Sequence, residues 1–267
     1  MITIDPSPMT QTNFTRQEMM VVAASRLLSD SDVCLVGIGA PSVACNLARL
    51  THAPNIRLIY ESGTIDTKPN VLPLSIGDGE LCDTALTTVS LPEVFRYWLQ
   101  GGRISVGFLG GAQIDRYANL NTSVIGDYHH PSARLPGAGG APEIATNCGR
   151  VFITMDMSRR RFVRQLSFLT TLGFGQGGNH RAELGVETQG PVAVITDLCI
   201  LEPHPTTKEL TVTMLHAGVT QDEVSDACEW DLRFALNVDV TPPPSTEELT
   251  ALRDLKERTR QAHIRDD

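Results

Sequence analysis

Residues 34–63, CLVGIGAPSVACNLARLTHAPNIRLIYESG, contain the pattern that decides the fold. A short apolar run, Cys34–Val36, enters a glycine turn, and a segment with helical spacing follows from Val43 to about Leu50. A second apolar run, residues 56–60, then ends at Glu61. Strand, helix and strand in this order indicate two parallel strands that are joined by a crossover helix.

The same alternation continues on both sides of this stretch. Upstream, Thr15 and Glu18 form a capping-box pattern before a helix that we expect to reach about Leu28. Downstream, the pattern predicts a helix near residues 92–100 and strands near 104–109, 151–155, 192–196 and 211–215. We therefore predict an α/β fold, a single domain around a largely parallel sheet with flanking helices.

The ends of the chain differ in composition from this predicted domain, which covers residues 14–240. Residues 1–13 are polar and contain proline, so we expect a flexible leader. Residues 241–267 begin with a proline-rich stretch and are helical in pattern from about Ser245. We expect this C-terminal helical tail to lie on the surface or to dock a partner.

The composition argues against several classes of partner. The chain has 267 residues, with 31 acidic and 22 basic side chains and a net charge of −9. Such an acidic chain is a poor binder of nucleic acid or of acidic membranes. It contains no apolar run of membrane-spanning length, no signal-peptide pattern, and six cysteines without CxxC spacing. We therefore predict no nucleic acid, no membrane, no bound metal and a cytoplasmic location.

The turn Gly37–Ser42 is similar to a dinucleotide-binding loop, because glycines after a strand let backbone N–H groups approach a phosphate. Glu61, at the end of the next strand, stands near the position of the ribose-binding carboxylate. However, Ser42 replaces the third glycine, and Pro41 lies inside the turn. Dinucleotide binding is therefore the minority interpretation. Alternatively, the N–H groups of this turn bind another anion or a carbonyl oxygen, or the segment is only a tight β–α turn without a ligand.

Glu61 is the most informative candidate for chemistry. Open α/β sheets bind ligands at the carboxyl ends of their strands, where Glu61-Ser62-Gly63 lies, and small residues leave room for a substrate beside the carboxylate. A glutamate carboxylate is able to attack a thioester and form an acyl–glutamyl anhydride. Taken alone, a carboxylate at this position is more often a loop residue or a cap.

Three further clusters allow both a functional and a structural interpretation. For the glycine loop of residues 135–141, the functional interpretation is a mobile wall of the site or a donor to an oxyanion, and the structural interpretation is a surface loop. The pair His129-His130 has no acidic or cysteine partner at ligand spacing, so a structural or substrate-edge role outweighs metal binding. The cluster Arg159–Arg161 with Arg164 either binds phosphate or forms the solvent-exposed face of a helix.

Several motifs occur together in the order of a known family. They are GIGAPSVACNLA (37–48), YESG (60–63), GFLGGAQID (107–115), NTSVIGDYHHP (121–131), GAGGAPEIA (137–145) and RRRFVRQLSFLTT (159–171). In this combination the chain resembles the B (β) subunit of class I CoA-transferases. It is most similar to the B subunits of glutaconate and 3-oxoadipate CoA-transferases. The resemblance spans about residues 14–235.

The resemblance implies a role for individual residues. Glu61 corresponds to the family's catalytic glutamate, which forms an acyl anhydride and then an enzyme–CoA thioester. The backbone N–H groups that hold the oxyanion correspond to Gly37 and Gly39 in the turn and to Gly139 and Gly140. Gln113 corresponds to an amide that lines the same cleft. Coenzyme A is a substrate in this family, and no cofactor is bound permanently.

The resemblance also implies a partner and a substrate class. Family members pair this subunit with an α (A) subunit of similar fold, and an α2β2 assembly is expected. The acid is a small carboxylic or dicarboxylic acid such as glutaconate or 3-oxoadipate, with acetyl-CoA or succinyl-CoA as the donor. Arg116 and Arg134, with Arg96, are candidates for binding a distal carboxylate. Alternatives are an acyl-CoA hydrolase or decarboxylase on the same fold, a ligand-sensing protein or a non-catalytic scaffold subunit.

Overall fold

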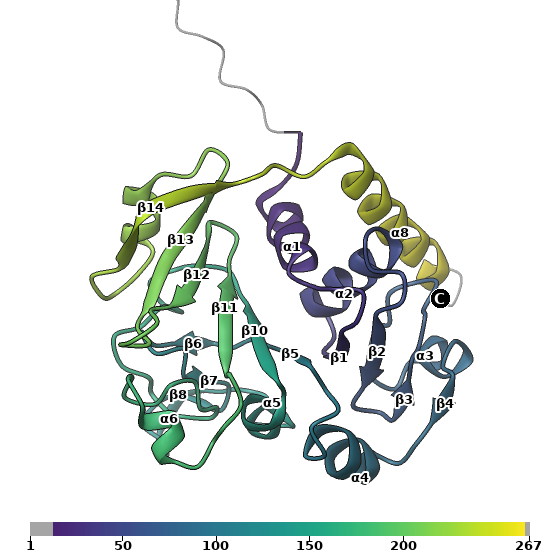
Figure 1. The fold of residues 1–267 in the computed structure, drawn as a ribbon, viewed down its shortest axis with the longest axis horizontal. Coiled ribbons are helices and arrows are strands. Elements are labelled where there is room, and N and C mark those ends of the chain that lie inside the picture. Colours follow the sequence, from purple (N-terminus) through teal and green to yellow (C-terminus); the bar gives the residue numbers. More distant parts are fainter. Residues whose placement is uncertain (1–12, 265–267) are drawn as a thin grey trace, which may run out of the picture.

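The computed structural model describes residues 13–264, in which one ten-stranded mixed sheet has helices on both faces (Figure 1). The helices are α1 (Arg16–Arg26), α2 (Ala40–Leu50), α3 (Gly79–Asp83), α4 (Leu91–Glu93), the π-helical turn η1 (Val94–Leu99), α5 (Ala141–Asn147), α6 (His180–Glu183), α7 (Gln221–Asp226) and α8 (Thr246–Ile264). The predicted leader, residues 1–13, lies outside the described residues except for Asn13.

The large sheet runs through the whole molecule. From one edge to the other its strands are β14 (Arg233–Thr241), β13 (Leu210–His216), β12 (Cys199–Pro203), β11 (Pro191–Ile195), β10 (Arg150–Thr154), β5 (Val106–Leu109), β1 (Val33–Val36), β2 (Arg57–Tyr60), β3 (Thr64–Ile65) and β4 (Thr87–Thr88). Two small hairpins pair β6 (Gln113–Ile114) with β7 (Leu120–Asn121) and β8 (Val124–Gly126) with β9 (Pro131–Arg134).

The centre of the sheet is parallel, as predicted. Strands β11, β10, β5, β1 and β2 are neighbours in that order, and every pair among them is parallel. In the described part of the large sheet, antiparallel pairs occur only outside this block, at β11–β12, β12–β13, β2–β3 and β3–β4. The α/β prediction is confirmed, and the antiparallel strand β12 and the edge strand β14 are additions to it.

The buried side chains form two layers, because successive residues of a strand point to opposite faces. Leu35 and Ile59 belong to one layer, which also contains residues of η1 and α5. Val36, Leu58 and Tyr60 belong to the other, which is covered by α1 and α2. The second helix begins at Ala40, earlier than the predicted Val43. Proline is well tolerated in a first helical turn, so Pro41 does not exclude this earlier start.

The predicted tail helix is present as α8, and it packs against α1 and α2 of its own chain (Figure 1). Arg253 Nε donates to Glu18 Oε1 over 2.8 Å, and Arg26 Nη2 lies 2.6 Å from Glu248 Oε2. The hydrogen bond from Arg253 lowers the pKa of Glu18 to about 2. The capping box of Thr15 and Glu18 is also confirmed. Within residues 13–264, no helix has the length and apolar character that crossing a membrane requires.

Candidate functional site

A tight turn at the end of β2 presents Glu61. The N–H of Gly63 donates to the Tyr60 carbonyl over 3.0 Å, so Glu61 and Ser62 occupy the corner. Gly63 has a positive φ of 106°, and a Cβ there would overlap the carbonyl oxygen of Val89. Gly63 therefore lets the chain turn back against Val89, whereas the sequence suggested only that it leaves room for a substrate.

The glycine turn after β1 lies beside this corner. Gly39 has a φ of 85° and is the N-cap of α2. Ser42, at the place where a dinucleotide loop has its third glycine, forms a hydrogen bond with the buried Tyr60 hydroxyl (Oγ to OH, 2.8 Å). Desolvation raises the pKa of Tyr60 to about 12, which keeps this hydroxyl neutral. Ser42 thus ties the start of α2 to the strand end that precedes Glu61.

A cleft of about 320 Å³ opens at the carboxyl ends of β1, β2 and β5, and Glu61 is part of its lining. The glycine turn contributes Gly37 and Pro41, and the end of β5 contributes Leu109 and Gly110. The glycine loop contributes its stretch of residues 136–141. The two glycine segments that the sequence singled out are therefore walls of one cleft with Glu61. Gly39 itself is not among the lining residues.

The Glu61 carboxylate is half-buried and has no polar partner among the described residues. Burial raises its pKa above the ordinary glutamate value. Within residues 13–264 its oxygens have neither a hydrogen bond nor an ion pair. Its closest constraint is steric, because a Cβ on Gly140 would lie 2.8 Å from Glu61 Oε1 and 2.7 Å from Phe95 Cζ. Gly140 must therefore remain a glycine for the carboxylate to keep this position.

Two helix N-termini without a side-chain cap lie at the wall of the same cleft. Helices α1, α3 and α7 begin with side-chain caps, from Thr15, Asp78 and Thr220. In contrast, α2 and α5 begin at Gly39 and Gly140, neither of which has a side chain to cap the helix. Within the described part of the chain, the N–H groups of Gly139 and Gly140 have no hydrogen-bond partner. They remain available to an oxygen atom of a ligand.

The glycine loop is fixed through α5. A Cβ on Gly107 of β5 would lie 2.5 Å from Ile144 Cγ2, so this glycine allows α5 to pack directly on the strand. The buried Arg181 donates from Nη2 to the Ala145 carbonyl over 2.6 Å. Desolvation lowers the pKa of Arg181 to about 10. These contacts hold the helix whose first residues form the cleft wall.

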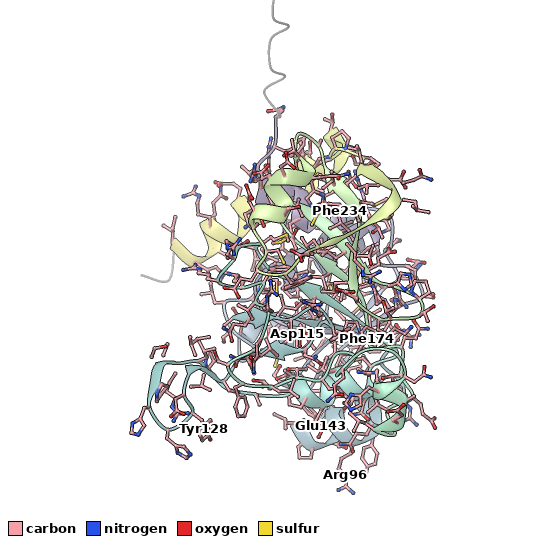
Figure 2. The ribbon with its side chains drawn as sticks, turned by 90° about the vertical axis from the view of Figure 1, so that its left-hand side faces the viewer. Arg96, Asp115, Tyr128, Glu143, Phe174 and Phe234 are labelled. Carbon is pink, nitrogen blue, oxygen red and sulfur yellow. The ribbon has the colours of Figure 1, made fainter. Side chains whose placement is uncertain are left out.

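The other predicted site residues lie elsewhere. Gln113 is buried and lines a second cavity, not the one that contains Glu61. Arg116 pairs with Glu209 at 3.5 Å, and Arg134 donates to the Tyr128 carbonyl on the β8–β9 hairpin, which projects from the body (Figure 2). Arg96 is exposed and points outward (Figure 2). The structure therefore does not bring these three arginines to Glu61.

His129 and His130 lie in the turn of the projecting hairpin, where both backbone N–H groups donate to Asp127 Oδ1. No group of three or more metal-binding side chains occurs among residues 13–264. Phe95, whose ring lies close to Gly140, was not singled out from the sequence. The sequence around Phe95 gives no signal for this position, because it depends on how η1 packs against α5.

Comparisons with known proteins agree with this geometry. The family model described as Coenzyme A transferase matches residues 17–227. The chain is 58% identical to the B subunit of 3-oxoadipate CoA-transferase from Pseudomonas knackmussii, over 94% of this chain and 96% of that protein. It is 33% identical to the B subunit of glutaconate CoA-transferase from Acidaminococcus fermentans, over 87% of this chain and 89% of that protein. The crystal structure of glutaconate coenzyme A-transferase from that organism superposes with a TM-score of 0.84, at 30% identity, covering 91% of this chain and 94% of that one.

Proposed function

Because the chain belongs to the coenzyme A transferase family, as a class I B subunit, we propose that it supplies Glu61 as the nucleophile of a 3-oxoadipate CoA-transferase. The observation that carries this proposal is the free, half-buried Glu61 carboxylate between two glycine walls. A carboxylate held by an arginine or lysine would be a weaker nucleophile.

The proposed reaction needs only this carboxylate and the two substrates. A Glu61 oxygen attacks the thioester carbonyl carbon, the C–S bond breaks, and CoA leaves as a thiolate. The thiolate then attacks the Glu61 carbonyl of the resulting anhydride, which expels the first acid and leaves a glutamyl–CoA thioester. The carboxylate of the second acid reverses both steps and restores Glu61. No electrons or protons are gained or lost overall, and coenzyme A is a substrate.

Backbone N–H groups are proposed to stabilise the negative charge that develops on the attacked carbonyl oxygen. The donors are those of Gly139 and Gly140, which have no partner in the described residues, together with Gly37 in the opposite wall. One such donor contributes about 3 kcal/mol to transition-state stabilisation. Gly39, which caps α2, orients the opposite wall in this scheme.

The acid is proposed to be 3-oxoadipate, and glutaconate is the second candidate. The basis is the higher identity to the relative from 3-oxoadipate CoA-transferase, 58% against 33% for the relative from glutaconate CoA-transferase. Both relatives are the B subunits of their enzymes. We propose that this chain also works with an α (A) subunit, in an α2β2 assembly, which would cover the cleft and exclude water from the anhydride.

Trapping the covalent intermediate tests the proposal. The chain is co-purified with its α (A) subunit, incubated with succinyl-CoA and treated with hydroxylamine or borohydride. A mass change on the peptide that contains Glu61 is expected, and Glu61→Ala is expected to lack both this adduct and the exchange of CoA. Glu143→Gln is the matched control, since Glu143 is an exposed carboxylate on α5 next to the same cleft.

The acceptor is identified with the same complex by comparing 3-oxoadipate, glutaconate and acetate. The proposal expects the highest kcat/KM for 3-oxoadipate. Exchange at the wild-type rate by the Glu61→Ala complex would refute the covalent role, and a preference for acetate would refute the dicarboxylate assignment.

A further inference from the structure

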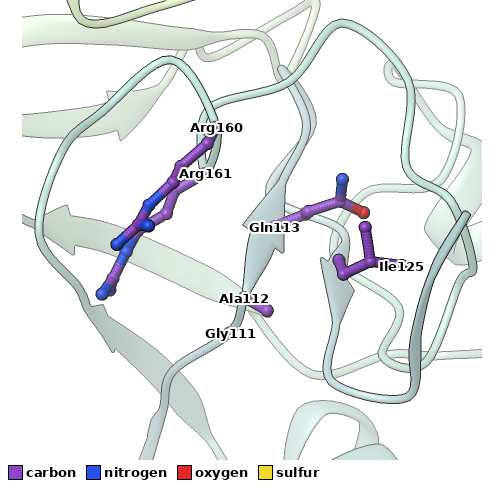
Figure 3. A pocket seen from close by; sticks show the side chains of 6 residues that line it. All are labelled: Gly111, Ala112, Gln113, Ile125, Arg160 and Arg161. Carbon is purple, nitrogen blue, oxygen red and sulfur yellow. The ribbon is translucent and has the colours of Figure 1, made fainter. Parts of the chain in front are cut away.

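A second cavity, of about 340 Å³, lies next to the Glu61 cleft and has a different chemical character. Its lining consists of Gly111, Ala112, Gln113, Ile125, Arg160 and Arg161 (Figure 3). Two of these residues are cationic and none is acidic. In an acidic chain with a net charge of −9, such a pocket provides local attraction for an anion that the whole molecule would repel.

The two arginines have charge available for a ligand. Arg160 is exposed and has no ion pair or hydrogen bond with the described residues. Arg161 is partly exposed and pairs only loosely with Asp156, at 3.5 Å. Guanidinium groups bind phosphate and carboxylate oxygens through paired N–H donors. The cavity therefore has the donors that a phosphate group needs.

Gln113 also lines this cavity, but its side chain points away from the two arginines, toward Ile125 (Figure 3). Its Oε1 accepts from Asn121 Nδ2 over 2.7 Å and from the Ser167 N–H over 3.0 Å. These two donors determine which side-chain atom is the oxygen. The Nε2 group has no partner among residues 13–264, although the residue is only 7% exposed. Gln113 thus retains a donor that protein groups do not satisfy.

The position of this cavity relative to Glu61 indicates which anion it binds. Gly110 lines the Glu61 cleft and the next residue, Gly111, lines the arginine cavity, so the two cavities share a pair of consecutive glycines in their walls. Arg160 lies in the segment after β10, and Glu61 directly follows β2; the axes of these two strands are three strand spacings, about 14 Å, apart. This separation suits a ligand with its reactive carbonyl and its anionic groups at opposite ends of a long arm.

We propose that Arg160 and Arg161 form a subsite for the phosphate groups of the CoA thioester, with the pantetheine arm crossing Gly110 and Gly111 toward Glu61. The inference rests on the proposed function. The distal carboxylate of the acid is the alternative source of a similar anion, but a small dicarboxylic acid is much shorter than a CoA thioester.

A truncated thioester tests the assignment in the assembled two-subunit enzyme. Exchange is measured with succinyl-CoA and with succinyl-N-acetylcysteamine, which lacks all phosphates. The double variant Arg160→Gln/Arg161→Gln is expected to lower kcat/KM for succinyl-CoA roughly tenfold to a hundredfold, mainly through KM. For the truncated thioester, the ratio of variant to wild type is expected to stay near one. Arg159→Gln is the matched control, because Arg159 belongs to the same cluster without lining the cavity.

Several outcomes would overturn the assignment. An equal loss with both thioesters would indicate a structural effect, and a loss restricted to dicarboxylic acceptors would assign the arginines to the distal carboxylate. No loss with succinyl-CoA would remove the subsite altogether.

Calorimetric binding of CoA to the wild-type and variant complexes separates this inference from the proposed function. Arginine-dependent binding without any exchange activity would refute the transferase proposal and keep the subsite. Exchange and binding that are both insensitive to the double variant would keep the transferase and refute the subsite.

Discussion

The two neighbouring cavities are opposites in charge. The Glu61 cleft contains a carboxylate without an ion pair among the described residues, surrounded by glycines, prolines and apolar side chains. The cavity beyond Gly110 contains Arg160 and Arg161. Had the arginines lined the first cleft, they would have lowered the pKa of Glu61 and tied up its oxygens. A nucleophilic carboxylate and a strongly cationic anion site are thus able to occupy neighbouring cavities of one sheet, with consecutive glycines in their linings.

The largest effect is expected from removing the charge of the Glu61 cleft. Glu61→Gln keeps the size of the side chain and removes the nucleophile, so exchange is expected to fall by about 10⁴-fold or more. Steady-state exchange by the two-subunit complex measures this loss.

The same substitution makes a prediction about stability. Because the folded-state pKa of Glu61 is raised, its protonated form favours the fold below the unfolded-state pKa, and this advantage is lost as pH rises through the folded-state pKa. Neutral glutamine mimics the protonated form. At pH 7 the melting temperature is therefore expected to be equal to or above that of the wild type. A clear decrease would mean that Glu61 has a structural partner.

A smaller effect is expected from crowding the carboxylate without removing it. Gly140→Ala places a methyl group 2.8 Å from Glu61 Oε1, so the carboxylate must shift. A misplacement of about 1 Å costs roughly 10²-fold in rate. Gly79→Ala is the control, because a Cβ there meets no atom within 4 Å and φ is not positive. Unchanged kcat in Gly140→Ala would show that the Glu61 position is not critical.

The pH dependence of the wild-type complex tests the environment of the same carboxylate. Only the ionised form of Glu61 attacks the thioester, and burial raises its pKa above 4.5. On the acid side, kcat/KM is expected to fall about tenfold per pH unit, beginning at a higher pH than for an ordinary glutamate. A pH–rate profile that stays flat down to pH 4.5 would contradict the raised pKa.

The smallest effect is expected in the arginine cavity. Asp156→Asn removes the loose ion pair with Arg161 and leaves that guanidinium free. Since exposed pairs are worth at most about 1 kcal/mol, KM for the CoA thioester is expected to decrease only about two- to fivefold. Asp254→Asn is the control, because it removes a similar exposed pair on α8. An increase in KM would indicate that Asp156 itself contributes to binding.

Much of the parallel core could be predicted from the sequence. The runs around β1, β2, β5 and β10 are short and apolar, and glycine or polar residues follow soon after each. Their spacing was therefore sufficient to predict the central strands. Because Glu61 directly follows the run that forms β2, its location at the end of a strand was predictable as well. Strand β14 was not predicted, although residues 233–241 have an apolar side chain at every second position, from Phe234 to Val240. The two-residue strands β3, β4, β6 and β7 exist because of their tertiary partners and leave no periodic signal.

The candidate site was predictable only where it is built from consecutive residues. The turn around Gly37 and the loop around Gly140 are local motifs, and they do line the cleft with Glu61. Gln113 lies three residues from Gly110, yet that distance along the chain carries it into the second cavity. Arg160 and Phe95 reach their positions through the path of segments that leave the sheet. Sequence spacing does not encode that path.

The two ion pairs between α8 and α1 have a consequence for how this chain folds during its synthesis. The first helix after residue 13 gains its ion pairs with Glu248 and Arg253 only from the last helix described. During synthesis the strands of the parallel centre leave the ribosome before α8 does. Until α8 is available, Glu18 and Arg26 therefore lack their ion-pair partners. Pulse-labelled protease protection of α1 should therefore rise late, after α8 has been translated.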